Sequence, residues 1–381
     1  MGLVEGALNG VINIVLLLVI LVVLVVIHEF GHFIVARRAK VRVHEFGIGF
    51  PPRARVLGRD HETVYTLNWL PIGGFVRLEG EEGESDDPRA FVNQRLGTRL
   101  VILLAGVVMN MLIAFLLFSV IAGVADPLAN ARIGTVTSGS PAEQVGLTGA
   151  QQTGTDAEGR PVLDMSGDLI VAIDGQRFPV FDNIDLRNGE TPQGVYLRQH
   201  AGREVTLTIR HIDGTVEDIP VTLRSPERAA TEGALGVIFN EVPREDIQRD
   251  PADAVATGFR RTIDASTLIL RGLRDLITDL SDPQVSGPVG IVGAVGVVRT
   301  ELPPTFLFWL VGLLSANLAV INALPFPPMD GGRVAVSLLQ AVSGNRISPA
   351  LERAVYLTGF VLLMALLAWI TFFDIQRLGG T

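Results

Sequence analysis

Four long runs of apolar residues divide the chain, and each is long enough to cross a bilayer as a helix. They extend over about 11–36, 100–124, 305–324 and 354–373. Because crossing the hydrocarbon core takes about 20 apolar residues, the pattern predicts four transmembrane helices. The first run is not expected to be a signal peptide, since no Lys or Arg precedes it and it is longer than the apolar part of such a segment.

Three weaker patterns lie between these runs. Residues 43–78 contain alternating, β-rich stretches broken at glycines and a proline, which predicts a hairpin region. It is either an ordinary cytoplasmic hairpin or an edge strand that pairs with an unwound substrate. Residues 251–281 predict an amphipathic helix, either on the outer membrane surface or packed against the preceding domain. Residues 287–298 are too short to span, so we expect an interfacial or re-entrant segment.

The composition narrows the class of protein. Of the 381 residues, 48% are hydrophobic and 19% are charged, whereas soluble domains carry about 25% charged residues. The formal net charge of −9 gives no reason to expect nucleic acid as a partner. The chain has no Cys, which excludes disulfides, thiol nucleophiles and Cys-based metal sites. Any metal site must therefore use His and carboxylate ligands.

Positive charges predict the orientation of the chain in the membrane. Many Arg residues and one Lys lie between the first and second runs, and three Arg lie between the third and fourth, whereas none precedes the first. Short cytoplasmic loops are enriched in Lys and Arg, so both of these loops are expected to be cytoplasmic. Residues 125–304 and both termini are then expected outside.

The first apolar run contains the sequence His28-Glu29-Phe30-Gly31-His32. Positions i and i+4 share a helix face, so the two imidazoles converge on one point, where they can bind Zn²⁺. Glu29 is offset by one residue and can take a proton from water held there. A charged helix end that reaches the interface is the alternative, but ionisable residues at membrane depth indicate a functional site.

A tetrahedral zinc site needs a third protein ligand besides two His, and Asp330 is expected to provide it. It ends the segment Asn322-Ala-Leu-Pro-Phe-Pro-Pro-Met-Asp330, which emerges on the cytoplasmic side, at the depth of His28. A plain cytoplasmic turn would show the same pattern. In the second run, Gly106 and Asn110 share a helix face, and Asn110 needs either an interhelical hydrogen bond or a substrate contact.

Together these segments resemble the site-2 protease family of intramembrane zinc metalloproteases (peptidase family M50), in particular its bacterial RseP type. HEFGH matches the family's HExxH, residues 322–331 resemble NxxPxPxLDG with Met329 in place of Leu, and residues 106–110 resemble GxxxN. The resemblance implies that His28, His32 and Asp330 bind Zn²⁺ and that Glu29 is the catalytic base. It also implies substrate contacts by Asn322, for which Asn110 is a further candidate.

Residues 131–225 resemble a bacterial PDZ domain. Residues 133–147 resemble its strand, turn and short helix, and residues 167–176 resemble the strand pair that follows. Residues 148–166 lie between them and are interpreted as an inserted loop. The domain is expected either to bind an extended peptide or a free C-terminus, or to act as a size filter that binds nothing tightly.

The expected fold is a polytopic α-helical membrane protein with a membrane-associated β hairpin region and one extracytoplasmic PDZ-like α+β domain, in the bacterial cytoplasmic (inner) membrane. Its expected segments are a first transmembrane helix with HEFGH (1–36), a cytoplasmic β-rich loop (37–98), a second transmembrane helix (99–125), the PDZ-like domain (126–245), an amphipathic and interfacial segment (246–304), a third transmembrane helix (305–325), a cytoplasmic loop (326–353) and a fourth transmembrane helix (354–374).

The expected activity is regulated intramembrane proteolysis. The protein would cut transmembrane segments of single-pass membrane proteins, such as an anti-sigma factor by analogy with the family. The first alternative is a non-catalytic PDZ membrane scaffold, which would need no base such as Glu29 beside two His. The second is a metal transporter, which inverted repeats would favour, and the sequence shows none.

Overall fold

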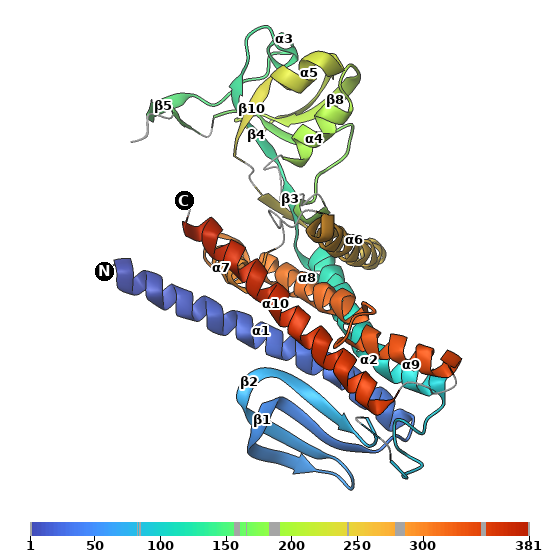
Figure 1. The fold of residues 1–381 in the computed structure, drawn as a ribbon. Helices are drawn as coiled ribbons and strands as arrows, with labels where there is room; N and C mark the ends of the chain where they lie inside the picture. The colour runs from blue at the N-terminus through green and yellow to red at the C-terminus, as the bar shows by residue number, and fades with distance from the viewer. Residues whose placement is uncertain are drawn as a thin grey trace. The chain divides into compact units, whose positions relative to one another are not determined.

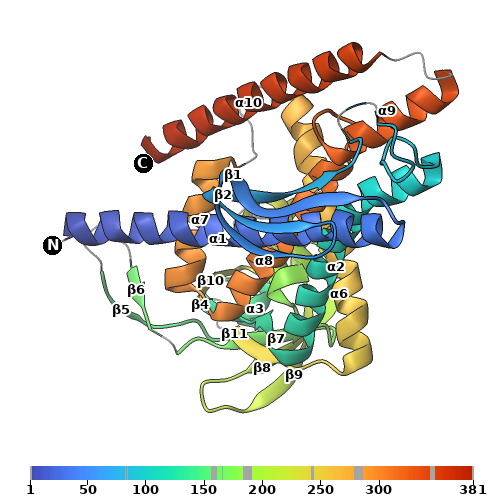
Figure 2. The ribbon, with the colours of Figure 1, turned by 90° about the horizontal axis from the view of Figure 1, so that it is seen from below.

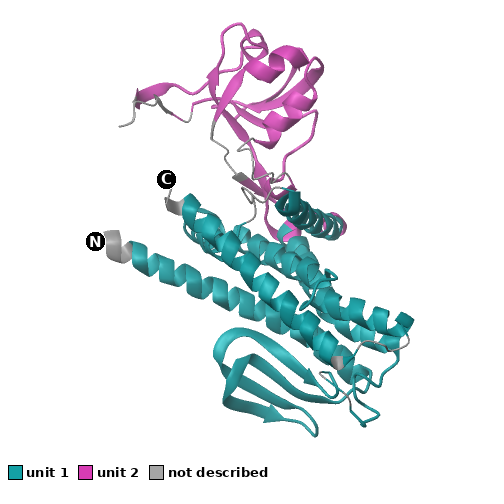
Figure 3. Ribbon diagram, viewed as in Figure 1, with its two compact units in different colours: residues 1–121, 255–381 teal, residues 122–254 magenta. Residues whose placement is uncertain are grey.

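The computed structural model describes residues 2–81, 83, 85–155, 161–164, 166–182, 191–241, 244–278, 286–343 and 348–379. The chain forms two compact units, shown in different colours in Figure 3. Unit 1 comprises Met1–Ile121 and Val255–Thr381, and unit 2 comprises Ala122–Ala254.

Long apolar helices dominate unit 1. Among the described residues, four helices are long and apolar enough to cross a membrane, as the sequence predicted. Apolar chain in lipid must satisfy its backbone polar groups internally, and a helix does so. Many of their apolar side chains face outward, and Val108, for example, is 63% exposed. The four helices are α1 (Gly2–Arg38), α2 (Leu96–Val124), α8 (Pro304–Ala323) and α10 (Pro349–Gly379).

Three further helices complete unit 1: α6 (Pro251–Thr278), α7 (Pro288–Glu301) and α9 (Asp330–Ser343). Helix α7 contacts α1, α8 and α10 (Figures 1 and 2), and its Val295 is fully buried. Helix α6 approaches α2 closely, since a side chain on Gly258 would collide with Ser119. The opposite face of α6 exposes Phe259 and Ile263.

The β region of unit 1 consists of two long, bent antiparallel strands, β1 (Val43–Arg59) and β2 (Val64–Leu78). Because both strands fold back, Phe46 pairs with Tyr65 on one side and with Val76 on the other. The pairing thus gives four segments in the order 74–78, 43–48, 64–68 and 53–59. The buried Glu45 carboxylate joins them by accepting hydrogen bonds from Arg53 and Thr66.

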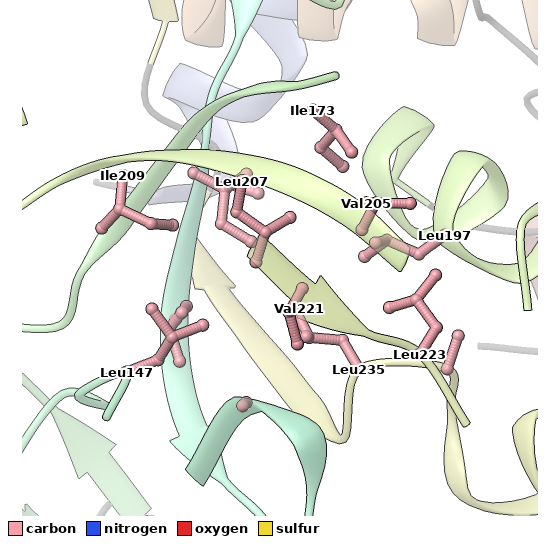
Figure 4. Packing of buried hydrophobic residues seen from close by; sticks show 14 of the residues in the cluster. Leu147, Ile173, Leu197, Val205, Leu207, Ile209, Val221, Leu223 and Leu235 are labelled. Carbon is pink, nitrogen blue, oxygen red and sulfur yellow. The ribbon is translucent and has the colours of Figure 1, made fainter. Parts of the chain in front are cut away.

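Unit 2 is built on a five-stranded antiparallel sheet in the order β10-β4-β7-β8-β9. Fully buried aliphatic side chains, including Ile209 and Leu207, form its core (Figure 4). The strands of the sheet are β4 (Ala131–Val136), β7 (Leu169–Ile173), β8 (Glu204–Arg210), β9 (Val216–Thr222) and β10 (Val237–Glu241). The helices are α3 (Pro141–Gln144), the 3-10 helix η1 (Val180–Asp182), α4 (Pro192–Gln199) and α5 (Pro226–Glu232).

Two small strand pairs accompany this sheet. One joins β3 (Asp126–Ala129) to β11 (Arg244–Ile247), and the other joins β5 (Gln152–Thr155) to β6 (Pro161–Leu163). The second pair lies within the segment interpreted as an insertion, 148–166, of which residues 156–160 and 165 lie outside the described part. The insertion is tied to the sheet at its start, because the Thr148 amide donates to the buried Asp168 carboxylate at 2.8 Å.

Candidate metal centre

Three side chains from two distant parts of the chain converge in unit 1. Helix α1 places His28 and His32 on one buried face, one turn apart, and their Nε2 atoms lie 3.2 Å from each other. Asp330 comes 302 residues after His28 and begins α9. Its Oδ2 lies 2.8 Å from Nε2 of His28 and 3.2 Å from Nε2 of His32. Three potential metal-ligand atoms therefore face one point.

A tight turn between α8 and α9 brings Asp330 to this point. Helix α8 ends at Ala323, and the prolines that follow cannot continue it. The next helix begins with Asp330, and the backbone at the end of α8 and in the turn packs directly against the two glycines that follow. A Cβ on Gly331 would lie 2.3 Å from the Ala323 carbonyl oxygen, and one on Gly332 would lie 2.7 Å from the Pro327 nitrogen. Only glycine allows this close return of the chain.

The three donor atoms fit a zinc ion. Tetrahedral ligands at Zn–N and Zn–O distances of 2.0–2.2 Å lie roughly 3.3–3.5 Å apart, and the separations of 2.8–3.2 Å are close to this. Two imidazole nitrogens and one carboxylate oxygen form a donor set typical of catalytic zinc, which keeps its fourth position for water or substrate. Magnesium and calcium prefer oxygen ligands.

Helix α2 forms the wall of this site. The Ile102 carbonyl oxygen lies 2.8 Å from Nδ1 of His32, and the Asn110 amide lies 3.3 Å from Nδ1 of His28. Between them, Gly106 faces the donor atoms directly, because a Cβ there would lie 2.5–2.6 Å from both Nε2 atoms. Gly106 and Asn110, which the sequence predicted to share a helix face, therefore both lie next to the imidazoles. A contact of Asn110 with substrate stays a prediction.

Glu29 follows His28 on the edge of the same site. Its carboxylate and the nitrogens of the two imidazoles lie within 4.8 Å of one another, so it can also be counted among metal-binding groups. The edge segment of the β region runs beside it, because a Cβ on Gly74 would lie 3.8 Å from Glu29 Cγ. A carboxylate at this position can exchange a proton with a water molecule close to the three ligand atoms.

Comparison with known proteins identifies the family. A family model for peptidase family M50 matches residues 16–366, which is most of the chain. The chain belongs to peptidase family M50. This confirms the expected family and the expected class of enzyme, a zinc metalloendopeptidase with Zn²⁺ as its metal.

Three relatives match almost the whole chain. A putative zinc metalloprotease of Clostridium perfringens is 30% identical and covers 92% of this chain and 94% of its own. One of Clostridium acetobutylicum is 29% identical, covering 92% and 93%. The zinc metalloprotease RasP of Oceanobacillus iheyensis is 28% identical, covering 92% and 96%.

The structure also shows a contact of this M50 peptidase that the sequence did not reveal. Arg333, one turn after Asp330, forms an ion pair with Glu81 in the acidic segment 79–88. Glu81 accepts a second hydrogen bond from the Leu78 amide at 3.2 Å. Through Glu81 the acidic segment ties the start of α9 to the end of β2. A run of acidic residues in a loop does not indicate which helix it will contact.

Asn322, the other predicted substrate contact of this M50 peptidase, is partly buried in the last turn of α8. It precedes the turn that carries Asp330. Its predicted role, like the individual roles of the three ligands and of Glu29, stays a prediction.

Proposed function

We propose that this M50 peptidase is an intramembrane protease that cleaves transmembrane segments of single-pass membrane proteins. The observation that carries the proposal is the convergence of His28, His32 and Asp330, with Glu29 beside them, within a bundle of apolar helices. Ionisable groups at such depth are costly in lipid and are retained for function. The lipid bilayer is therefore the medium in which the enzyme meets its substrate.

In this proposal His28, His32 and Asp330 hold Zn²⁺. The chemistry supplied there by the bound ion is that of a Lewis acid, which polarises a carbonyl group and lowers the pKa of water toward about 7. Glu29 accepts a proton from the attacking water and passes it to the amine that leaves. Asn322 is the proposed contact for the unwound substrate backbone, whereas Asn110, the further candidate, is fully buried beside His28.

Substrate helices must unwind before they can be cut, and the β region offers a way to hold the extended chain. Residues 74–78 form an edge of the four-segment arrangement, and Gly74 lies in contact range of Glu29. An extended peptide can pair with a sheet edge by main-chain hydrogen bonds. We infer that the substrate is held as an added strand along this edge.

Unit 2 supports the proposed PDZ function. A cleft of about 470 Å³ lies between α4 and the loop that leads into β10, and Leu197, Leu235 and Phe239 contribute apolar lining. Strand β10 is at the edge of the sheet, as strand addition requires. The Arg224 guanidinium holds the loop by donating to the carbonyl oxygens of Glu232 and Gly233.

In the loop that leads into β10, the carbonyl groups point toward the rest of unit 2. Those of Ala234, Leu235 and Gly236 accept hydrogen bonds from the backbone of unit 2. The N–H groups are then the hydrogen-bonding groups that the loop can offer to a ligand, and N–H groups are what captures a C-terminal carboxylate. We infer that unit 2 binds a hydrophobic free C-terminus, as produced by an earlier cut outside the membrane. To test this, the affinity of the protein for a hydrophobic peptide with a free C-terminus is compared with its affinity for the same peptide with an amidated C-terminus. The amidated peptide should bind more weakly.

The proposal includes the orientation expected from charge. From the basic residues that follow α1 and α8 we infer that the β region and α9 lie in the cytoplasm, and that unit 2 and both termini lie outside. By analogy with the family, the membrane is the bacterial inner membrane and the substrate a signalling protein such as an anti-sigma factor. The orientation can be tested with single cysteines introduced into unit 2 or into the β region. In intact cells, a thiol reagent that cannot cross the membrane should label only those in unit 2.

The test of the metal site needs no natural substrate. Elemental analysis of the purified protein should give about one zinc per chain, sharply reduced in Asp330→Ala and unchanged in Asp86→Ala, which removes an exposed carboxylate. Glu29→Gln should keep zinc and lose cleavage of a single-pass test substrate in vesicles. Zinc that is indifferent to Asp330 would refute the ligand set. Cleavage that survives Glu29→Gln would refute the assignment of the base.

A further inference from the structure

Asn110 occupies a place in the site that substrate binding does not explain. It lies in α2 with 0% of its surface exposed. Its Nδ2 lies 3.3 Å from Nδ1 of His28, and its Oδ1 is buried with no hydrogen-bond partner in the described part of the chain. A buried amide oxygen without a donor is unfavourable. The orientation of this amide therefore has to be decided from the hydrogen bonds around it.

The metal site decides the orientation. An imidazole that binds a metal through Nε2 carries its proton on Nδ1, so Nδ1 of His28 is a donor. A donor cannot be satisfied by the amide NH₂ group, which has no free lone pair directed at it. Rotating the amide by half a turn exchanges its oxygen and nitrogen without changing the space that the side chain fills, so the orientation is decided by the partners of the two atoms. The oxygen then accepts from Nδ1–H, and both mismatches disappear.

We propose that Asn110 is a positioning residue: its side-chain oxygen accepts a hydrogen bond from Nδ1–H of His28 and thereby directs the Nε2 lone pair at the zinc ion. This rests on the metal site proposed above. The buried Ser315 hydroxyl donates to the Asn110 backbone carbonyl at 2.8 Å, which fixes this turn of α2 against α8. The backbone of Asn110 is thus fixed by Ser315, while its side chain contacts the His28 imidazole.

The two histidines differ in how they are held. His32 directs Nδ1 at the Ile102 carbonyl oxygen at 2.8 Å, and a backbone carbonyl only accepts, so this tautomer is fixed whatever the side chains are. His28 depends on one side chain, Asn110. A change at Asn110 should therefore weaken one ligand and leave the other in place.

The experiment measures zinc affinity of the full-length protein by competition with a chelator of known affinity. Asn110→Leu keeps the size of the side chain and removes the acceptor, whereas Asn110→Asp keeps an acceptor in the same place. Loss of such a supporting hydrogen bond costs about 10–100-fold in metal affinity. We expect this loss for Asn110→Leu and an affinity equal to or tighter than the unmodified protein for Asn110→Asp. Asn110→Ala gives the same comparison if the leucine variant does not fold.

Two controls separate the possible failures. Ser119→Ala removes a hydrogen bond within α2, to the Phe115 carbonyl oxygen, nine residues away from Asn110, and zinc affinity should stay within about twofold of the unmodified protein. Asp330→Ala reports on the proposed site itself. If Asp330→Ala weakens zinc while Asn110→Leu does not, or if the leucine and aspartate variants weaken it equally, the positioning role is wrong. If Asp330→Ala has no effect, the metal site on which it rests is wrong.

Discussion

Gly106→Ala is the smallest change that should empty the metal site without unfolding the protein. Its added methyl group would lie 2.5 Å from Nε2 of His32 and 2.6 Å from Nε2 of His28. Ordinary contact begins at 3.4 Å, so the two nitrogens would have to retreat by about 0.9 Å and about 0.8 Å respectively. Metal–ligand bonds tolerate about 0.2 Å, so the required displacement is several times larger than a zinc site can absorb.

The added methyl group should weaken zinc binding more than folding, and the reason is the kind of atoms that it would contact. They are the ends of two side chains, which can rotate away, so the helices keep their positions. Removing a single group that supports a ligand already costs about 10–100-fold in metal affinity. Displacing two ligands at once should cost at least about 100-fold, which corresponds to about 2.7 kcal/mol of binding free energy.

Zinc affinity and thermal unfolding, measured on the same purified samples, test this reasoning. Gly97→Ala is the matched control, because it adds the same methyl group to the same helix where no atom lies within 4 Å. We expect unaltered zinc affinity for Gly97→Ala, and for Gly106→Ala a metal-free protein with a near-normal unfolding temperature. If the Gly106 variant binds zinc as tightly as the control, the ion does not lie between α1 and α2.

Three further expectations follow from contacts outside the three ligands. Gly31→Ala directs its methyl group at the Ala105 carbonyl, 2.5 Å away in the backbone of α2, so it should lower the free energy of unfolding by about 1–3 kcal/mol, as thermal unfolding would show. Glu81→Gln should loosen α9, which increased proteolysis near Arg333 would reveal. The hydrogen bond to Asp168 raises the pKa of His211, so its stabilisation of unit 2 is complete below about pH 6.5 and is lost as the pH rises through the folded-state pKa. Amide exchange near Thr148 should show this pH dependence, and His211→Gln should abolish it.

The sequence predicted best what depends on one helix at a time. The four spans follow from length and apolarity, and the approach of His28 and His32 follows from helical spacing. The placement of Asp330 was predicted from the side of the membrane on which its segment emerges, and its proximity to both imidazoles in the structure agrees with that expectation.

Contacts between elements were much harder to predict. No sequence pattern indicates that the Ile102 carbonyl accepts a hydrogen bond from His32, because a backbone acceptor is present at every position. The amphipathic pattern of α6 predicted a two-sided helix, but it could not indicate that the small residue Gly258 would pack on α2. Strand alternation predicted the hairpin region, whereas the double pairing of Phe46 depends on where the strands bend.

The long separation between the ligands has a consequence for the synthesis of the enzyme. His28 and His32 leave the ribosome early, and 302 residues separate His28 from Asp330. At about 5–20 residues per second, the third ligand follows after roughly 15–60 s. During that interval the nascent chain has the proposed base and two of the proposed ligands but no complete site. A chain that is interrupted before α9 lacks the proposed third ligand and is therefore expected to be inert as a protease.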